Sequence, residues 1–272
     1  MSVDKKGASW RQPESELLRL PRAVWRALQH TRGRLAKKIK RLTLRARWAA
    51  RSRKKANTSA NVATVLDRTG VSVINLAHRK ERIAEFRLEM ERIEVKEWQR
   101  VEAVDGGEIF PKIDRFFSAS IGCTLSHIAA LEQADWREKD AWMVCEDDAQ
   151  FLTDRDELSR ILAAFINDAS LDVLALYGRA RGASHRIESG LRISQGIVGR
   201  VCYVVKPHMK QVLIDEFFAG VPRLLKGIRR GKGDQMWRKL QRSRYFFATP
   251  ARTMVQNRAG YSDIEGRILG AR

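Results

Sequence analysis

Three adjacent carboxylates, Glu146, Asp147 and Asp148, directly follow the apolar run Ala141-Trp-Met-Val-Cys145. This run predicts a buried strand, so we expect the carboxylates at its carboxyl end. Neighbouring carboxylates repel one another unless a cation neutralises them, and a hard divalent ion with oxygen ligands suits that role. Because alternate residues of an extended segment point the same way, Glu146 and Asp148 can face one ligand. An acidic loop or a helix cap explains the same residues equally well.

Another acidic residue of interest is Asp234. It is the single acid in the basic stretch 223–244, which also contains nine Lys and Arg. The surrounding cations keep its carboxylate ionised, so that it can accept a hydrogen bond. The pattern fits a carboxylate at a reaction centre, and it fits equally an N-cap of the helix predicted from Gln235 onward. The basic stretch suits an acidic partner or a solvated surface.

The body of the chain alternates predicted strands with predicted helices, which indicates an α/β fold with a mostly parallel central sheet. Ligands of such sheets bind beyond the carboxyl ends of the strands. Asp105-Gly106-Gly107 predicts a turn after the second strand. The expected strands are 71–76, 98–104, 141–145, 172–177 and 197–205, and the expected helices are 83–93, 120–136, 156–166 and one opened by Pro207.

The net charge of +20 is concentrated in the first part of the chain. Residues 1–60 hold 18 Lys and Arg against 3 Asp and Glu, whereas the rest of the chain is close to balanced. We therefore divide the chain into a basic arm with its linker, residues 1–60, and a body, residues 65–272.

The arm has apolar residues at helical steps, with Arg and Lys between them, and Pro21 suits a helix start. Basic amphipathic helices lie on anionic membrane surfaces, so residues 14–50 predict membrane contact. A helix docked on the body or on a partner fits the same pattern, and nucleic-acid binding is a third hypothesis. Residues 51–64 predict a polar linker. The apolar residues are Val24, Trp25, Leu28, Leu35, Ile39, Leu42 and Trp48.

Several classes of protein are disfavoured by what the sequence lacks. No apolar stretch approaches the ~20 residues that span a bilayer, and the first residues lack the apolar middle of a secretory signal. Three cysteines without a C-x-x-C pair favour a reduced, cytoplasmic compartment. Neither a GxGxxG nor a GxxxxGK[ST] loop is present.

Four segments in order resemble glycosyltransferase family 25, the lipopolysaccharide-type galactosyl- and glucosyltransferases. They are VINLAHRKER at 73–82, AVDG at 103–106, IGCTLSH at 121–127 and EDD at 146–148. Gly178, the 199–205 segment, Asp234, Gln256-Asn257 and Ser262-Asp263-Ile264 follow in the expected order, so the resemblance spans roughly residues 70–265. The sequence departs from the family's pattern at Arg200, where small or hydroxyl residues are usual, and it lacks a Pro before Asp234.

The resemblance implies a GT-A-like nucleotide-sugar fold and an inverting transfer of a hexose, expected to be galactose from UDP-galactose, onto a lipopolysaccharide or other cell-surface glycan. The acceptor is then an acidic or lipid-linked saccharide. Asp148 and Glu146 would bind Mn²⁺ or Mg²⁺, and Glu146 and Asp147 would contact the donor. Inversion needs a base for the acceptor hydroxyl, and Asp234 is the candidate, with acceptor positioning as its alternative role.

The resemblance also assigns donor contacts to residues of the first strand and of the helix after it. Asn75 would meet the nucleotide at the end of that strand. Arg79 and Arg82, on the opening turns of the next helix, would pair with phosphate, although a solvated helix face suits Arg82 equally.

Further donor contacts are expected from the second and third matching segments. Asp105 and Gly106 would let the backbone approach the donor, or they form a plain turn. Ser126 and His127, expected at a helix start, would donate to phosphate, with a buried structural histidine as the alternative.

Two other hypotheses stay open. The chain is either a non-catalytic scaffold of the same fold, or a basic nucleic-acid-binding protein, which the lack of a known RNA- or DNA-binding signature disfavours. For the enzyme, we expect a cytoplasmic protein held peripherally at the inner face of the membrane.

Overall fold

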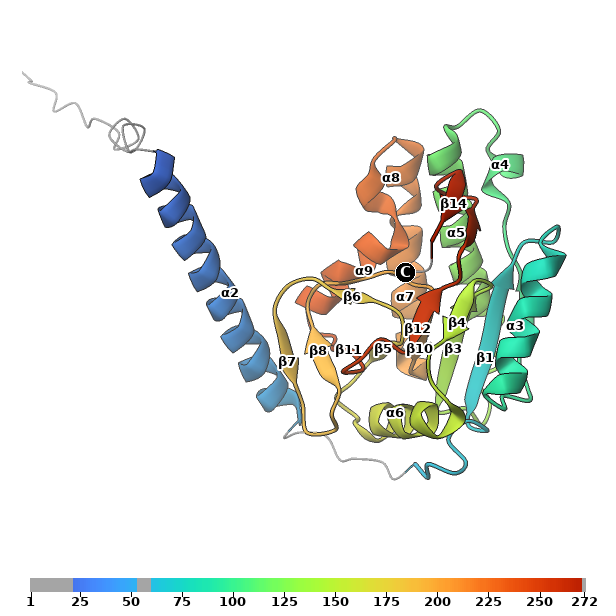
Figure 1. The fold of residues 1–272 in the computed structure, drawn as a ribbon, viewed down its shortest axis with the longest axis horizontal. Coiled ribbons are helices and arrows are strands. Elements are labelled where there is room, and N and C mark those ends of the chain that lie inside the picture. Colours follow the sequence, from blue (N-terminus) through green and yellow to red (C-terminus); the bar gives the residue numbers. More distant parts are fainter. Residues whose placement is uncertain (1–21, 53–59, 271–272) are drawn as a thin grey trace, which may run out of the picture.

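An eight-stranded sheet forms the centre of the computed structural model, which describes residues 22–52 and 60–270 (Figure 1). Six of the eight strands run in one direction, and β10 and β8 run against them. The sheet is therefore mixed, with the expected parallel strands interrupted by two reversed ones. In spatial order the strands are β2 (Gln99–Glu102), β1 (Thr69–Asn75), β3 (Ala141–Glu146), β10 (Cys202–Val205), β5 (Val173–Ala175), β11 (Phe247–Thr249), β8 (Arg192–Ser194) and β7 (Ser184–Arg186).

Alternate side chains of the central strands enter two separate cores, one on each face of the sheet. Along β3, Met143 and Cys145 pack on one face, while Trp142 and Val144 pack on the other. The first core lies under α3 (Lys80–Arg92) and α6 (Arg155–Asn167). The second lies under α5 (Arg115–Glu132), η1 (Pro207–Met209), α7 (Lys210–Phe218) and α9 (Gly233–Arg242). This arrangement is an α/β fold, as the alternation of strands and helices predicts.

The strand predicted over residues 197–205 is wrong as a single element. It is split into β9 (Ile197–Val198), which pairs with β6 (Arg179–Ala180), and β10, which joins the central sheet. Gly199 separates the two with φ +92°, a conformation that side chains rarely adopt. The break leaves Arg200 outside both ladders, in the segment between β9 and β10.

The carboxyl end of β3 is enclosed by segments from distant parts of the sequence. β4 (Ala149–Phe151) follows the acidic triplet and pairs with β12 (Val255–Asn257). The chain then forms the hairpin of β13 (Gly260–Ser262) and β14 (Arg267–Leu269), whose Tyr261 hydroxyl accepts a hydrogen bond from Arg115 at the start of α5. The short helices α4 (Gly106–Ile109), α8 (Val221–Leu225) and η2 (Arg229–Gly231) lie around the same end.

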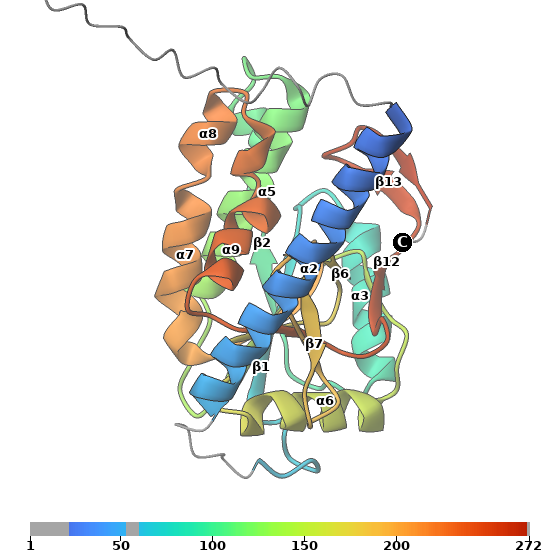
Figure 2. The same cartoon turned by 90° about the vertical axis from the view of Figure 1, so that its left-hand side faces the viewer.

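The helix α2 (Arg22–Ser52) packs on the body through its last turns and crosses β7 in Figure 2. Leu44 is 1% exposed, and Trp48 meets Phe246 edge-on with ring centroids 5.2 Å apart. Arg51 Nη2 lies 2.6 Å from Oδ1 of the buried Asp172. The docked-helix hypothesis therefore applies to residues 44–52, which belong to the body although the sequence assigns them to the arm.

Other predictions about the arm fall partly outside the described residues. Residues 1–21, with the helix start at Pro21, and residues 53–59 of the linker lie there, as do the side chains of residues 22–35. No helix in the described part of the chain is both long and apolar enough to cross a bilayer.

Candidate functional site

One amide and one guanidinium hold the buried side chain of Asp147 in place. Its carboxylate accepts hydrogen bonds from Asn75 Nδ2 at 2.7 Å and from Arg82 Nη1 at 3.0 Å. Burial raises the pKa of Asp147 to about 6, and the charge of Arg82 opposes that shift. Asp147 thus ties the end of β3 to β1 and α3.

Only one of the two carboxylate oxygens of Asp148 accepts a hydrogen bond. Oδ2 accepts from Asn257 Nδ2 at 2.9 Å, whereas Oδ1 is buried and has no hydrogen-bond partner. Burial, followed by the charge of Glu146, raises the pKa of Asp148 to about 6. A buried carboxylate oxygen without a partner is costly. A divalent cation would supply the missing interaction, so the donor set fits Mn²⁺ or Mg²⁺.

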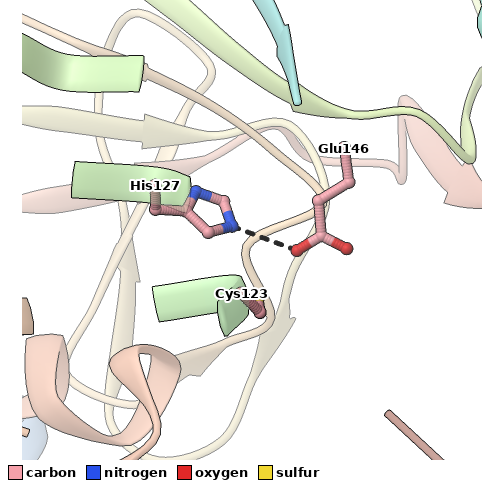
Figure 3. A group of neighbouring side chains, drawn as sticks. All are labelled: Cys123, His127 and Glu146. Atoms are coloured by element: carbon pink, nitrogen blue, oxygen red, sulfur yellow. Dashed lines mark hydrogen bonds and ion pairs between the residues drawn. The ribbon is translucent and has the colours of Figure 1, made fainter. Parts of the chain in front are cut away.

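Glu146 points toward α5 and contacts His127 (Figure 3). The His127 Nε2 to Glu146 Oε1 distance is 3.1 Å, and His127 Nδ1 lies 3.3 Å from the hydroxyl of Tyr203. A neutral imidazole protonated at Nε2 satisfies both contacts, because the tyrosine can donate to Nδ1. Burial lowers the pKa of His127 well below its ordinary value, consistent with this neutral form.

Cys123 lies one helical turn before His127, and ligand atoms of Cys123, His127 and Glu146 lie within 4.8 Å of one another (Figure 3). These residue types can hold a transition metal. However, burial raises the pKa of the Cys123 thiol to about 12, and Arg200 Nη2 lies 3.5 Å from its sulfur. A neutral thiol beside a guanidinium, with both imidazole nitrogens already bonded, is a poor cation site. The oxygens of Asp148 and Glu146 are the better ligands.

Two adjoining cavities open at this end of the sheet. The first, of about 240 Å³, is lined by Asp234, Arg200 and Lys232. The second, of about 280 Å³, is lined by Asp105, Gly106 and His127. Both are also lined by the same six residues, so the two cavities meet at the acidic triplet. The shared residues are Arg82, Cys123, Glu146, Asp148, Ser262 and Ile264.

Most of the residues predicted for the site line these cavities, but two do not. Asn75 is 1% exposed, and its amide is occupied by Asp147, by the carbonyl of Arg79 and by Arg100. Arg79 pairs with Asp263 at 2.8 Å and faces the ring of Tyr261. Both residues hold other parts of the site. The predicted residues that line a cavity are Arg82, Asp105, Gly106, Ser126, His127, Glu146, Asp147, Asp148 and Asp234.

Ser126 and His127 do not lie at a helix start, and that prediction is wrong. The helix α5 begins after Asp114, whose carboxylate accepts from Phe116 N, so both residues lie in its second half. Ser126 Oγ donates to Gly122 O at 2.7 Å and accepts from Val104 N at 2.8 Å. Its hydroxyl is therefore committed to the protein, and no helix N-terminus is available there for phosphate.

The turn predicted at Asp105 begins the helix α4, because the Asp105 carboxylate accepts from Gly107 N at 2.8 Å. Gly106 packs against α5, where a Cβ would overlap the carbonyl oxygen of Ser118. Gly122 is equally restricted, since a Cβ there would overlap the backbone of Val104 and Gly106. The lack of a side chain at Gly106 allows α4 to approach α5 closely.

Sequence reasoning did not assign three residues that contribute to the cavities. Asn257 bonds Asp148, Tyr261 O accepts from Arg82 Nη2, and Arg200 lines the first cavity. Asn257 lies in a segment of the family resemblance, which was the available signal. Arg200 was visible only as a departure from the family's pattern.

No family model and no curated protein matches this chain. Among solved structures, the crystal structure of A197 from STIV is similar, with a TM-score of 0.43 and 8% sequence identity. The match covers 74% of this chain and 93% of that one. At that identity, function has to be argued from the residues of the site itself.

Proposed function

We propose that this chain is a metal-dependent glycosyltransferase with a GT-A-like fold. It transfers a hexose, galactose from UDP-galactose in the first instance, with inversion onto an acidic or lipid-linked cell-surface glycan. The observation that carries the proposal is the buried, unpartnered Oδ1 of Asp148 at the junction of the two cavities. Residues from all four segments that resemble glycosyltransferase family 25 line the second cavity together with Asp148, which supports the same function.

Asp148 and Glu146 would hold Mn²⁺ or Mg²⁺ in this proposal, and the ion would stabilise the charge of the departing diphosphate as a Lewis acid. Arg82 lines both cavities and has its Nη1 on Asp147 at 3.0 Å. This contact places its positive charge beside the acidic triplet, where a diphosphate would lie.

The second cavity is assigned to the nucleotide-sugar donor, because Asp105 and Gly106 of the resemblance line it. The first cavity is assigned to the acceptor. Asp234 lines it, and the Asp234 carboxylate accepts from Gly199 N at 3.3 Å, which orients the group. Asp234 lies in the first turn of α9, whose N-cap is Lys232, so capping does not occupy it. Its proposed role is the base that takes the acceptor hydroxyl proton.

We also propose that the N-terminal part of the arm contacts an anionic membrane surface. On the described part of α2, Ile39 and Leu42 stay more than half exposed. Lys38, Lys40 and Arg41 flank them. An exposed apolar face among cations is the pattern of helices that lie at such surfaces.

The test of the proposed function is a screen of UDP-sugars with the full chain, with Mn²⁺ and with a chelator. We expect a UDP-sugar to raise the thermal midpoint and to be hydrolysed or transferred only when metal is present. Asp148→Ala should remove metal-dependent turnover, whereas Asp215→Asn, on the exposed side of α7, should not. If no UDP-sugar binds, or if Asp148→Ala retains normal turnover with metal, the proposal is wrong.

A further inference from the structure

Arg200 is a buried cation with an unused donor on the wall of the first cavity. Its side chain belongs to a residue only 6% exposed, yet Nη1 is buried and has no hydrogen-bond partner. Nη2 makes one weak contact, 3.5 Å from the sulfur of Cys123. Within the described residues, no carboxylate forms an ion pair with this guanidinium.

Burial of an unpaired guanidinium costs free energy, because its water is not replaced by protein acceptors. Glu146 and Asp234 line the same cavity, and neither forms an ion pair with Arg200. Arg200 lowers the pKa of Glu146 against the larger effect of burial. The guanidinium thus retains an unsatisfied donor, Nη1, in a side chain that lines the cavity.

The packing around Arg200 holds the guanidinium in one position. Its Cζ lies 4.7 Å from the centre of the Phe217 ring, so one face is covered. Its tip abuts Gly233, where a Cβ would overlap Nη1. The absence of a side chain at Gly233 therefore makes room for Arg200. Donors fixed before binding lose little entropy when a ligand arrives.

A second cation reaches the same cavity from the start of α9. Lys232 lines it and lies beside the ring of Phe116, with Nζ 5.4 Å from the ring centre. Four cations line this cavity. Arg82 pairs with Asp147 and Arg258 pairs with Glu85 and Glu89, whereas Arg200 and Lys232 form no ion pair within the described residues. Because Asp234 and the acidic triplet repel anions, an acidic ligand needs these cations in order to bind there.

We propose that Arg200, assisted by Lys232, is an anion-binding subsite that selects acceptors with a carboxylate or phosphate group. This inference rests on the assignment of the first cavity to the acceptor. Carboxylate and phosphate share the pair of oxygens that a guanidinium binds through two parallel hydrogen bonds. Arg200 then sets acceptor specificity, while Asp234, beside it, faces the hydroxyl that reacts.

Binding measurements on the full chain in a chelator test this subsite without turnover. The probes are methyl glucuronide for a carboxylate, glucose 6-phosphate for a phosphate, and methyl glucoside as the neutral partner. We expect at least one acidic probe to bind about tenfold more tightly than methyl glucoside. The acidic probe that binds more tightly shows whether the subsite prefers a carboxylate or a phosphate.

Three variants assign the preference to the subsite. Arg200→Gln should abolish the preference for acidic probes. Arg200→Lys should retain part of this preference, because lysine keeps the charge but lacks the planar pair of donors. Lys232→Gln, at a half-buried position, should weaken it and serves if the Arg200 variants do not fold. Lys239→Gln is the matched control, since that lysine lies on the exposed part of α9 and lines neither cavity.

Affinity for UDP-galactose with Mn²⁺, measured in the same variants, separates the two proposals. We expect the affinity of Arg200→Gln for UDP-galactose to stay within about twofold of the wild-type value. No acidic preference in the wild type, or a preference that survives in both Arg200→Gln and Lys232→Gln, overturns the subsite. A loss of UDP-galactose binding in Arg200→Gln overturns its assignment to the acceptor. If the acidic preference is present but no UDP-sugar binds, the subsite stands and the glycosyltransferase proposal fails.

Discussion

At the scale of single residues, three adjacent carboxylates differ in what their oxygens contact. Glu146 contacts His127, and Asp147 is bonded to Asn75 and Arg82. Asp148 leaves one buried oxygen free. Charge repulsion in the sequence pointed to a cation near all three. Only the surrounding side chains distinguish a carboxylate that is already neutralised from one that can take a ligand.

The stability of the metal-free protein should depend on pH through Asp148. Burial raises its pKa to about 6, above its unfolded value, so the folded state binds more protons between pH 4 and 6. The free energy of unfolding of the wild type, relative to Asp148→Asn, should therefore fall as pH rises through this window, by about 2 kcal/mol. Urea unfolding in chelator at several pH values measures this difference.

The control for that measurement is Asp135→Asn on the surface. Hydrogen bonds from Arg137 lower the pKa of Asp135 to about 2, so its stabilisation is present at neutral pH and lost on acidification. The Asp135 difference should thus have the opposite sign. A difference between wild type and Asp148→Asn that does not change with pH would show that Asp148 is solvated.

Replacing Asp234 distinguishes a base from a residue that only positions the acceptor. Asp234→Asn keeps the size of the side chain and removes its ability to take a proton. If it is the base, transfer to acceptor should fall about 10²- to 10⁴-fold while donor affinity is retained. An assay with UDP-galactose that compares transfer to the acceptor with hydrolysis of the donor measures this fall. Asp215→Asn is the control. Transfer at the wild-type rate would eliminate the base role.

At the scale of elements, close packing of α4 against α5 places Asp105 at the wall of the second cavity. The contact depends on Gly106 and Gly122, each of which faces backbone with no room for a Cβ. Both residues lie in segments that resemble the family, and for Gly106 the sequence suggested approach of the backbone to a ligand. The structure uses them for helix packing, which explains the same glycines without a ligand.

Gly122→Ala should destabilise the protein although alanine is the better helix former. Overlap with the backbone of Val104 and Gly106 should lower the free energy of unfolding by about 1–3 kcal/mol. Urea denaturation provides the measurement. Gly260→Ala is the control, because a Cβ there meets nothing within 4 Å. Equal stability of wild type and Gly122→Ala would contradict the tight contact.

At the scale of the whole molecule, the helix α2 joins the basic arm to the body. Leu44 and Trp48 pack against the first core, and Arg51 reaches Asp172, which His208 and Phe246 N also contact. The division between arm and body therefore falls within this helix, before Leu44. A cut at residue 60 would remove part of the core as well as the basic segment.

Two truncations separate these roles. Deletion of residues 1–52 should destabilise the body by about 3–5 kcal/mol, because it exposes the contacts of Leu44 and Trp48 and leaves the buried Asp172 with fewer partners. Deletion of residues 1–43 also removes the exposed Ile39 and Leu42 but keeps Leu44, Trp48 and Arg51, so it should leave stability nearly unchanged and weaken binding to anionic vesicles. Urea unfolding and vesicle sedimentation measure the two effects. Vesicle binding that persists in the shorter deletion would contradict the membrane proposal.

The alternation of apolar runs and amphipathic segments determined the α/β class, and the acidic triplet after residues 141–145 located the end of the sheet where the cavities lie. These features follow from local periodicity, which one sequence displays. The break at Gly199, the interior position of His127 and the free oxygen of Asp148 depend on contacts between residues far apart in the chain. Arg200 shows the difference most clearly. In the sequence it is one of many basic residues, and only burial against Phe217 and Gly233 makes it a cation with an unused donor.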